Sequence, residues 1–101
     1  MRLNPMRLSD HEKEAIVRHT HQVFGQNAQV YLFGSRTDDQ KRGGDIDLFI
    51  ETIDSPDNFS KKIKLLALLM ESLGEQKIDI VMAQDPTRLI EQEARNTGVQ
   101  L

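Results

Sequence analysis

The sequence predicts an α/β (α+β) fold in which a small mixed sheet of three or four strands carries helices packed on it. Alternating apolar runs at 29–33, 45–50 and 77–82 are typical of strands, and apolar residues recur at helical spacing from 58 to 73. A chain of 101 residues that is 38% hydrophobic has the size of one domain with a modest core. We therefore expect residues 1–101 to form a single domain.

A capping box predicts where the first helix begins. Ser9 and Glu12 have the S-x-x-E spacing, in which each side chain accepts a hydrogen bond from the other residue's backbone N–H group. Gly25 follows Phe24 and is typical of a helix end. We expect a helix that ends at Phe24.

Two strands then enclose a polar loop. The strand over 29–33 stops at Gly34, where a residue without Cβ permits a sharp exit, and residues 36–44 are polar, charged and glycine-rich. Because side chains alternate across a strand, Asp45 and Asp47 are expected on one face of the next strand, opposite its apolar residues. The two carboxylates should therefore converge.

A helix from about Asn58 to Leu73 is predicted to connect the second and third strands. It is long enough for a crossover, so these strands are expected to be parallel and neighbours. Asp79, on the third strand, would then lie beside Asp45 and Asp47.

The last helix is predicted to open at Asp85-Pro86. Aspartate is a favoured N-cap residue, and proline is favoured at the first helical position because it has no N–H group to leave unsatisfied. The predicted order is helix, strand, strand, helix, strand, helix.

Composition limits the classes of function. A net charge of −3 and a pI near 5.5 argue against a domain that wraps nucleic acid, so direct nucleic-acid binding is not expected. The absence of cysteine excludes disulfides and thiol nucleophiles. The longest apolar run, Leu65 to Met70, has six residues, far fewer than a membrane span needs. We expect a soluble, cytoplasmic protein without membrane contact.

The converging aspartates indicate a magnesium site beside a phosphate-binding turn. Mg²⁺ takes oxygen ligands and binds through a few protein carboxylates plus substrate phosphates. Asp45 and Asp47 can supply the protein ligands of Mg²⁺, and Asp79 would complete the site of a second ion. The Gly34-Ser35 turn offers backbone N–H groups and a hydroxyl to the outer phosphates of a nucleoside triphosphate.

Simpler interpretations remain open for several residues. Asp45 and Asp47 could be ordinary polar residues at a loop-to-strand entry, although the nearby Gly34-Ser35 turn favours the metal site. Arg36 could contact a phosphate or an acidic neighbour such as Asp38. The lysines at 61, 62 and 64 are interpreted as a solvated surface.

These residues carry a family resemblance. Phe33-Gly34-Ser35, the nine-residue spacer, Asp45-Ile46-Asp47-Leu48 and Ile78-Asp79-Ile80 resemble the DNA polymerase beta-like nucleotidyltransferase superfamily, and within it the minimal nucleotidyltransferase (MNT) group. The resemblance covers about Val30 to Met82. It implies the polymerase beta-like fold and transfer of a nucleoside monophosphate, AMP from ATP, to a hydroxyl on a protein or small molecule.

The resemblance also implies a role for each site residue. Gly34, Ser35 and Arg36 would bind the nucleotide phosphates. Asp45, Asp47 and Asp79 would be the catalytic residues and the ligands of two Mg²⁺ ions, with Asp79 helping to deprotonate the acceptor. Asp38-Asp39 departs from the Arg-Gly pair that is common at this point in the MNT group.

Two classes of function follow from the resemblance. Many MNT proteins are similar to antitoxins encoded beside a helical HEPN-type toxin, which implies a helical HEPN-like partner, or self-association. The alternative is a non-catalytic nucleotide-binding or protein-binding module that neutralises or scaffolds such a partner. Three converging acids favour the enzyme, because their mutual repulsion would destabilise a site that never held a cation.

Overall fold

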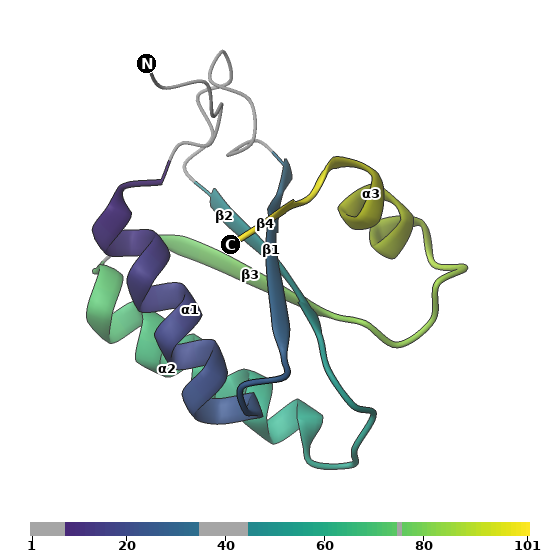
Figure 1. The fold of residues 1–101 in the computed structure, drawn as a ribbon, viewed down its shortest axis with the longest axis horizontal. Helices are drawn as coiled ribbons and strands as arrows, with labels where there is room; N and C mark the ends of the chain where they lie inside the picture. The colour runs from purple at the N-terminus through teal and green to yellow at the C-terminus, as the bar shows by residue number, and fades with distance from the viewer. Residues whose placement is uncertain (1–7, 35–44, 75) are drawn as a thin grey trace.

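A computed structural model of the protein describes residues 8–34, 45–74 and 76–101. Its elements follow the predicted order, with one short strand added at the C-terminal end (Figure 1). They are α1 (Asp10–Phe24), β1 (Gln29–Phe33), β2 (Asp45–Glu51), α2 (Asn58–Leu73), β3 (Lys77–Met82), α3 (Leu89–Thr97) and β4 (Val99–Gln100).

The strands form one mixed sheet in the order β3-β2-β1-β4. β1 pairs antiparallel with both β2 and β4, whereas β2 and β3 are parallel neighbours. The α2 crossover was expected to produce this parallel pair, and the expectation is confirmed. β4, to which no sequence signal pointed, is the fourth strand.

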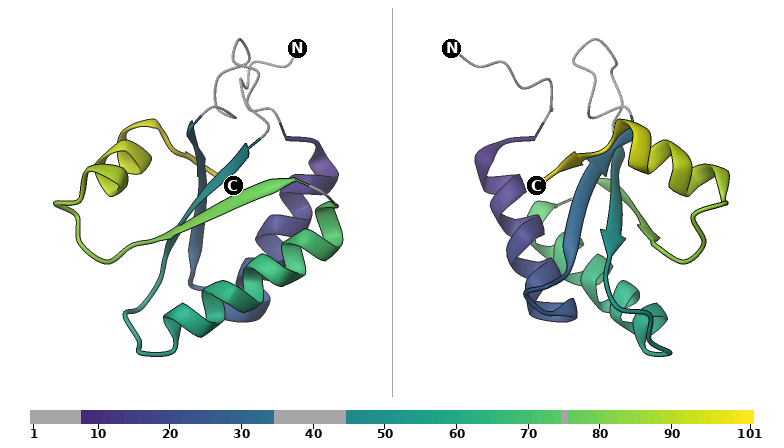
Figure 2. Two further views of the ribbon diagram at one scale, coloured as in Figure 1. Left: turned by 180° about the vertical axis from the view of Figure 1, so that it is seen from behind. Right: turned by 45° about the vertical axis from the view of Figure 1, so that its right-hand side comes forward.

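Helices cover the two faces of the sheet unequally. α1 and α2 lie side by side against one face, and the shorter α3 lies on the other (Figures 1 and 2). The main core fills the space under α1 and α2, where side chains such as Ile16, Leu48 and Leu65 are fully buried. A smaller cluster of Phe33, Phe49 and Ala94 packs under α3.

The ends of the first two helices follow the predicted local signals. At α1, Ser9 Oγ accepts from the Glu12 N–H at 3.1 Å, and a Glu12 carboxylate oxygen accepts from the Ser9 N–H at 3.0 Å. Gly25 and Gly74 close α1 and α2, and each donates its N–H to a carbonyl four residues earlier. Both helices have the predicted C-terminal ends.

The predicted start of the last helix is wrong. Asp85 Oδ1 accepts hydrogen bonds from the backbone N–H and the hydroxyl of Thr87, at 2.9 and 2.7 Å, which closes a tight turn. The chain enters α3 only at Leu89. An aspartate before proline can cap a helix or close such a turn, and here the bonds to Thr87 select the turn.

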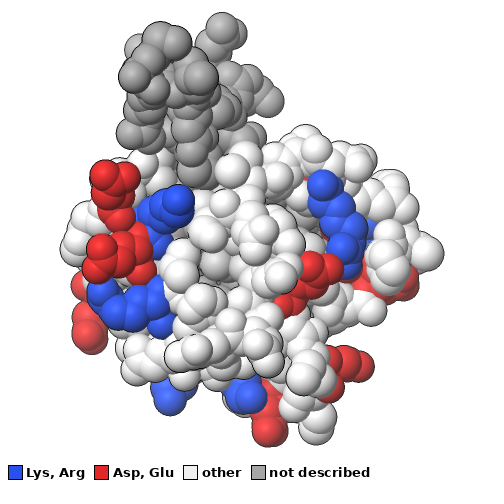
Figure 3. Space-filling view, viewed as in Figure 1, with Lys and Arg blue, Asp and Glu red and all other residues white. Residues whose placement is uncertain are grey.

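Within the described residues, no helix is long and apolar enough to cross a membrane. On the face drawn in Figure 3, acidic and basic side chains lie interspersed around a broad uncharged area. Neither sign dominates that face.

Candidate active site

The strand register brings two of the predicted aspartates together. Asp47 of β2 is paired with Asp79 of the parallel strand β3, and on its other side Asp47 is paired with Phe33, the last residue of β1. Ile46 and Leu48, its neighbours in sequence, are fully buried under the helices. Asp47 is half-buried and Asp79 is exposed, on the opposite face of the sheet. The predicted place of Asp79 beside Asp47 is therefore confirmed, whereas the convergence predicted for the Asp45 and Asp47 carboxylates stays a prediction.

The remaining predicted site residues are described only in part. The backbone of Asp45 begins β2 and is paired with Lys77, but the Asp45 side chain lies outside the described part of the structure. Ser35 and Arg36 also lie outside it, together with the acidic Asp38-Asp39 pair. Their proposed roles stay predictions.

Gly34 is held against the Asp47 carboxylate. Its φ of +78° lies in the left-handed region, which side chains other than glycine rarely adopt. A Cβ built at this position would also collide with Asp47 Oδ2. Both the backbone conformation and the close approach therefore require glycine, and the turn after β1 runs directly beside the carboxylate.

The two aspartates line one cleft, with a volume of about 590 Å³. Its wall also includes Lys62 and Ile63 of α2 and Glu93 of α3. The cleft thus places the two aspartates beside basic, apolar and acidic side chains from the flanking helices.

Lys62 was interpreted from the sequence as part of a solvated surface, and the structure corrects this. Its side chain is half-buried and lines the cleft. The signal was present in the sequence, since Lys62 is three residues after Phe59 and four before Leu66, which puts it on their side of the helix.

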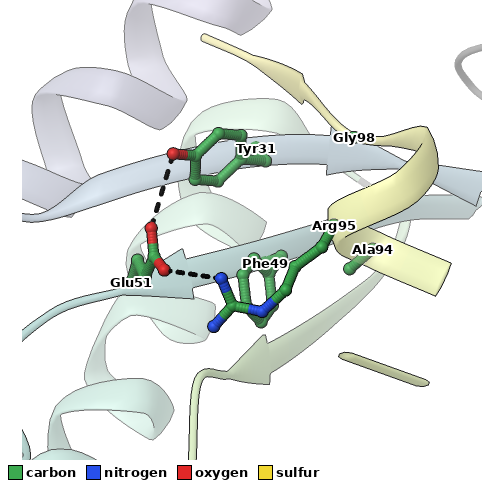
Figure 4. Close-up of a pocket in the computed structure, with 6 residues that line it drawn as sticks. All are labelled: Tyr31, Phe49, Glu51, Ala94, Arg95 and Gly98. Atoms are coloured by element: carbon green, nitrogen blue, oxygen red, sulfur yellow. Dashed lines mark hydrogen bonds and ion pairs between the residues drawn. The ribbon is translucent and has the colours of Figure 1, made fainter. Parts of the chain in front are cut away.

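A second, smaller pocket of about 180 Å³ lies under α3 (Figure 4). Arg95 donates to Glu51 at 2.8 Å and stacks over the Phe49 ring, with its guanidinium carbon 5.1 Å from the ring centre. The Tyr31 hydroxyl lies 3.4 Å from the other Glu51 oxygen, and burial together with the Glu51 charge raises the pKa of Tyr31. The Tyr31 hydroxyl forms its shorter hydrogen bond, 2.7 Å, to Gln29 Oε1 beside the pocket, so the polar groups of the pocket have partners within or next to it.

A family comparison decides the broad class of the protein. The family model described as "Polymerase beta, Nucleotidyltransferase" matches residues 16–101. The chain belongs to this family. The predicted superfamily is thereby confirmed, and the chain is a nucleotidyltransferase.

Solved structures share the nucleotidyltransferase fold. A chain from a mutant MntA–HpeT toxin–antitoxin structure superimposes with a TM-score of 0.68 at 24% identity, over 88% of this chain and 69% of that one. A chain from the complex of tri-AMPylated Shewanella oneidensis HEPN toxin with MNT antitoxin gives 0.65 at 22% identity, over 89% and 67%. A comparison with curated proteins found no significant match. The predicted polymerase beta-like fold is confirmed.

The carboxylate pair suits the divalent metal that nucleotidyltransferases generally use with a nucleoside triphosphate. Asp47 and Asp79 supply hard oxygen donors from paired strand positions, the donor type that Mg²⁺ prefers. Within the described ranges no group of three or more acidic or histidine side chains could hold a metal, and the Asp45 side chain is not among those residues. Two of the three predicted ligands therefore have a suitable arrangement.

Proposed function

We propose that this nucleotidyltransferase moves AMP from ATP to a hydroxyl group of a protein or small-molecule acceptor, in a reaction that depends on Mg²⁺. The observation that carries the proposal is the pairing of Asp47 with Asp79 in one cleft, with the Gly34 turn held against the Asp47 carboxylate. A purely structural module has no need for two adjacent acids at the end of a phosphate-binding turn.

Each site residue has a role in the proposal. Asp45, Asp47 and Asp79 would hold two Mg²⁺ ions, which would activate the attacking oxygen and stabilise the leaving oxygen. The N–H groups of the turn at Gly34 and Ser35 would bind the outer phosphates, with Arg36 beside them. The close approach of Gly34 to Asp47 supports these roles, because it places the proposed phosphate-binding turn next to a proposed metal ligand.

The chemistry is an in-line displacement at the α-phosphorus. The acceptor oxygen forms a bond to that phosphorus, the bond to the bridging oxygen of the β-phosphate breaks, and pyrophosphate leaves. Asp79 is exposed and lines the cleft, so it is suited to accept the proton that the acceptor hydroxyl loses.

We also propose that the chain acts in the cytoplasm as one minimal domain, the antitoxin-type partner of a small helical HEPN-like protein. The support is a fold shared with a chain from a complex of tri-AMPylated HEPN toxin and MNT antitoxin. In that complex the AMP groups are on the toxin, so a partner protein would present the acceptor group here.

The test is transfer of label from α-labelled ATP. Wild-type protein, Mg²⁺ and the product of the adjacent gene are incubated, and labelled acceptor and released pyrophosphate are followed over time. We expect equal amounts of both products from wild type. Asp79→Asn should lower the rate by at least about 100-fold, because proton acceptance and metal binding are both weakened.

Asp54→Asn is the matched control, since it removes one exposed carboxylate just after the end of β2, whereas Asp45 and Asp47 lie at the start of that strand. It should react like wild type. If wild type labels nothing yet binds the adjacent gene product tightly, the non-catalytic module is the correct function. Equal rates for Asp79→Asn and wild type would exclude the proposed role of Asp79.

A further inference from the structure

β3 forms one end of the sheet. Among the described residues only β2 pairs with it, so the outer side of β3 is a sheet edge. An edge strand presents backbone N–H and C=O groups that can pair with another extended chain. At the far end of β3, Arg88 Nη2 donates to the Met82 carbonyl at 2.9 Å, which occupies that end of the edge.

The cleft of the active site is built over this edge. Ile78 and Ile80 face the core under α2, whereas Asp79 and Val81 are on the opposite face, yet all four line the same cleft. Side chains from both faces of one strand can line a single cleft only where the cleft passes over the edge of that strand. The edge of β3 is therefore its floor.

The cleft continues into a second cavity of about 170 Å³ toward the end of β3. The two cavities share Lys62, Ile80, Val81 and Ile90, and together they form a continuous surface that we call the edge groove. One wall is α2 and the other is the start of α3. Figure 2, in its left-hand view, shows β3 crossing the molecule between these two helices.

The walls of the edge groove carry large apolar side chains that remain in contact with water. Phe59 is 72% exposed, Ile63 49% and Ile90 41%, and all three line the groove. Apolar side chains grouped around a groove typically mark a protein-binding surface. The groove thus combines backbone groups on its floor, apolar walls and carboxylates at one end.

We propose that the edge groove binds an extended segment of the protein acceptor as an added strand beside β3. Alternate side chains of that segment would contact Phe59 and Ile63 on one side and Ile90 on the other. A serine, threonine or tyrosine at the end near Asp79 would then have its hydroxyl at the carboxylates. This inference rests on the proposed function and assigns its acceptor to the protein class.

The first test compares two matched substitutions on α2. Ile63 and Met70 are large apolar residues with 49% and 52% exposure, but only Ile63 lines the groove. Binding of the adjacent gene product is measured by calorimetry with wild type, Ile63→Ser and Met70→Ser. Ile63→Ser should raise Kd about tenfold, because it removes a buried apolar contact, and Met70→Ser should leave Kd unchanged. Equal Kd values for the two variants would overturn the proposal.

The second test asks whether the bound segment is a strand. Hydrogen exchange is measured with and without the adjacent gene product. Pairing along the edge should slow exchange of β3 amides at least about tenfold, because outward N–H groups gain hydrogen-bond partners. A partner helix lying in the groove would bury the side chains of α2 while leaving exchange in β3 unchanged, and that result would overturn the added strand.

These measurements are independent of catalysis. If wild type binds the adjacent gene product through Ile63 but transfers no label, the edge groove stands and the proposed function fails. If label is transferred at the wild-type rate and KM by Ile63→Ser, the proposed function stands and the groove fails.

Discussion

At the residue scale, Gly34 shows how one position can serve both the fold and the site. Its left-handed backbone turns the chain out of β1, and the absence of a Cβ lets the turn lie against Asp47. Gly74 has nearly the same φ, +81° against +78°, but nothing within 4 Å of the place where a Cβ would stand. Substitution of Gly74 therefore tests backbone strain alone, whereas substitution of Gly34 tests strain together with contact with the carboxylate.

We expect Gly34→Ala and Gly74→Ala each to lower the free energy of unfolding by about 1 kcal/mol or more, because alanine is strained at positive φ. Only Gly34→Ala also displaces the Asp47 carboxylate. It should lower the rate of label transfer by about 100-fold, the scale expected for misplacing a catalytic group by about 1 Å. Urea denaturation gives the stabilities, and the transfer assay gives the rates. Equal loss of activity in both variants would mean that strain alone is responsible.

At the scale of the element, one buried carboxylate of α3 binds the segment that connects β3 to α3. Glu91 is fully buried, and its Oε2 accepts from the N–H groups of Gln84 and Asp85 at 2.9 and 2.8 Å. Arg88 Nε also donates to Oε2, at 2.8 Å. Burial raises the pKa of Glu91, but these hydrogen bonds and the Arg88 charge outweigh it, and the net pKa lies below the ordinary 4.5. The chain that follows β3 is thereby held in place.

This lowered pKa predicts how stability depends on pH. The unfolded state binds the proton more readily, so the stabilisation from Glu91 is complete above pH 4.5 and is lost as pH falls through the lower folded-state pKa. Glu91→Gln should remove this part of the acid dependence. It should also lower the free energy of unfolding at pH 7 by about 2 kcal/mol, since the charge-assisted hydrogen bonds are weakened.

Urea denaturation from pH 3 to pH 7 measures both effects. Glu14→Gln is the control, because Glu14 is exposed and forms only a 3.6 Å pair with Arg18 on the surface of α1. It should change stability by at most about 0.5 kcal/mol. The same acid dependence in Glu91→Gln and wild type would contradict the role given to Glu91.

At the scale of the whole molecule, the unequal covering of the sheet creates the site. Among the described residues, α1 and α2 bury one face, while α3 covers only part of the other, where Asp47 and Asp79 line the cleft. A ligand that binds in this cleft binds the folded protein and not the unfolded chain, so it should raise the free energy of unfolding.

Mg²⁺ with ATP is expected to raise Tm. At an ATP concentration of about ten times Kd, binding should raise the free energy of unfolding by about 1.4 kcal/mol. This corresponds to a rise in Tm of roughly 5–10 °C for a domain of this size. Differential scanning fluorimetry measures the shift, and EDTA should abolish it. Asp47→Asn should show no shift, whereas Asp54→Asn should shift like wild type. A wild-type shift in Asp47→Asn would exclude the proposed metal site.

Local signals predicted most of the fold. The capping box at Ser9 and the glycine after Leu73 act over one helical turn, and α1 and α2 have the predicted bounds. Asp85 did not predict the start of α3, because its carboxylate can cap a helix or close a turn. The sequence does not show which backbone N–H groups the carboxylate will bind. β4 has only two residues and no pattern of its own, so only its pairing with β1 reveals it.

The sequence predicted the carboxylates of the candidate site but not the helix residues around them. Strand alternation and the crossover helix were sufficient to bring Asp47 and Asp79 together, because register follows from the burial of alternate residues. Helical spacing puts Lys62 on the side of α2 that carries Phe59 and Leu66, but the sequence could not show that this side, or Ile63, borders the site. Their place depends on how α2 lies across β3, and that is fixed by packing between residues far apart in the chain.

The sequence by itself determined every element except β4 and the start of α3, together with the parallel pair of strands and the family chemistry, since these depend on periodicity, caps and a short motif that act locally. The tertiary structure alone decided what surrounds the carboxylates. It placed the edge of β3 on the floor of their cleft and apolar residues of α2 and α3 on its walls. Those contacts arise from the packing of separate elements around one core, which no single segment encodes.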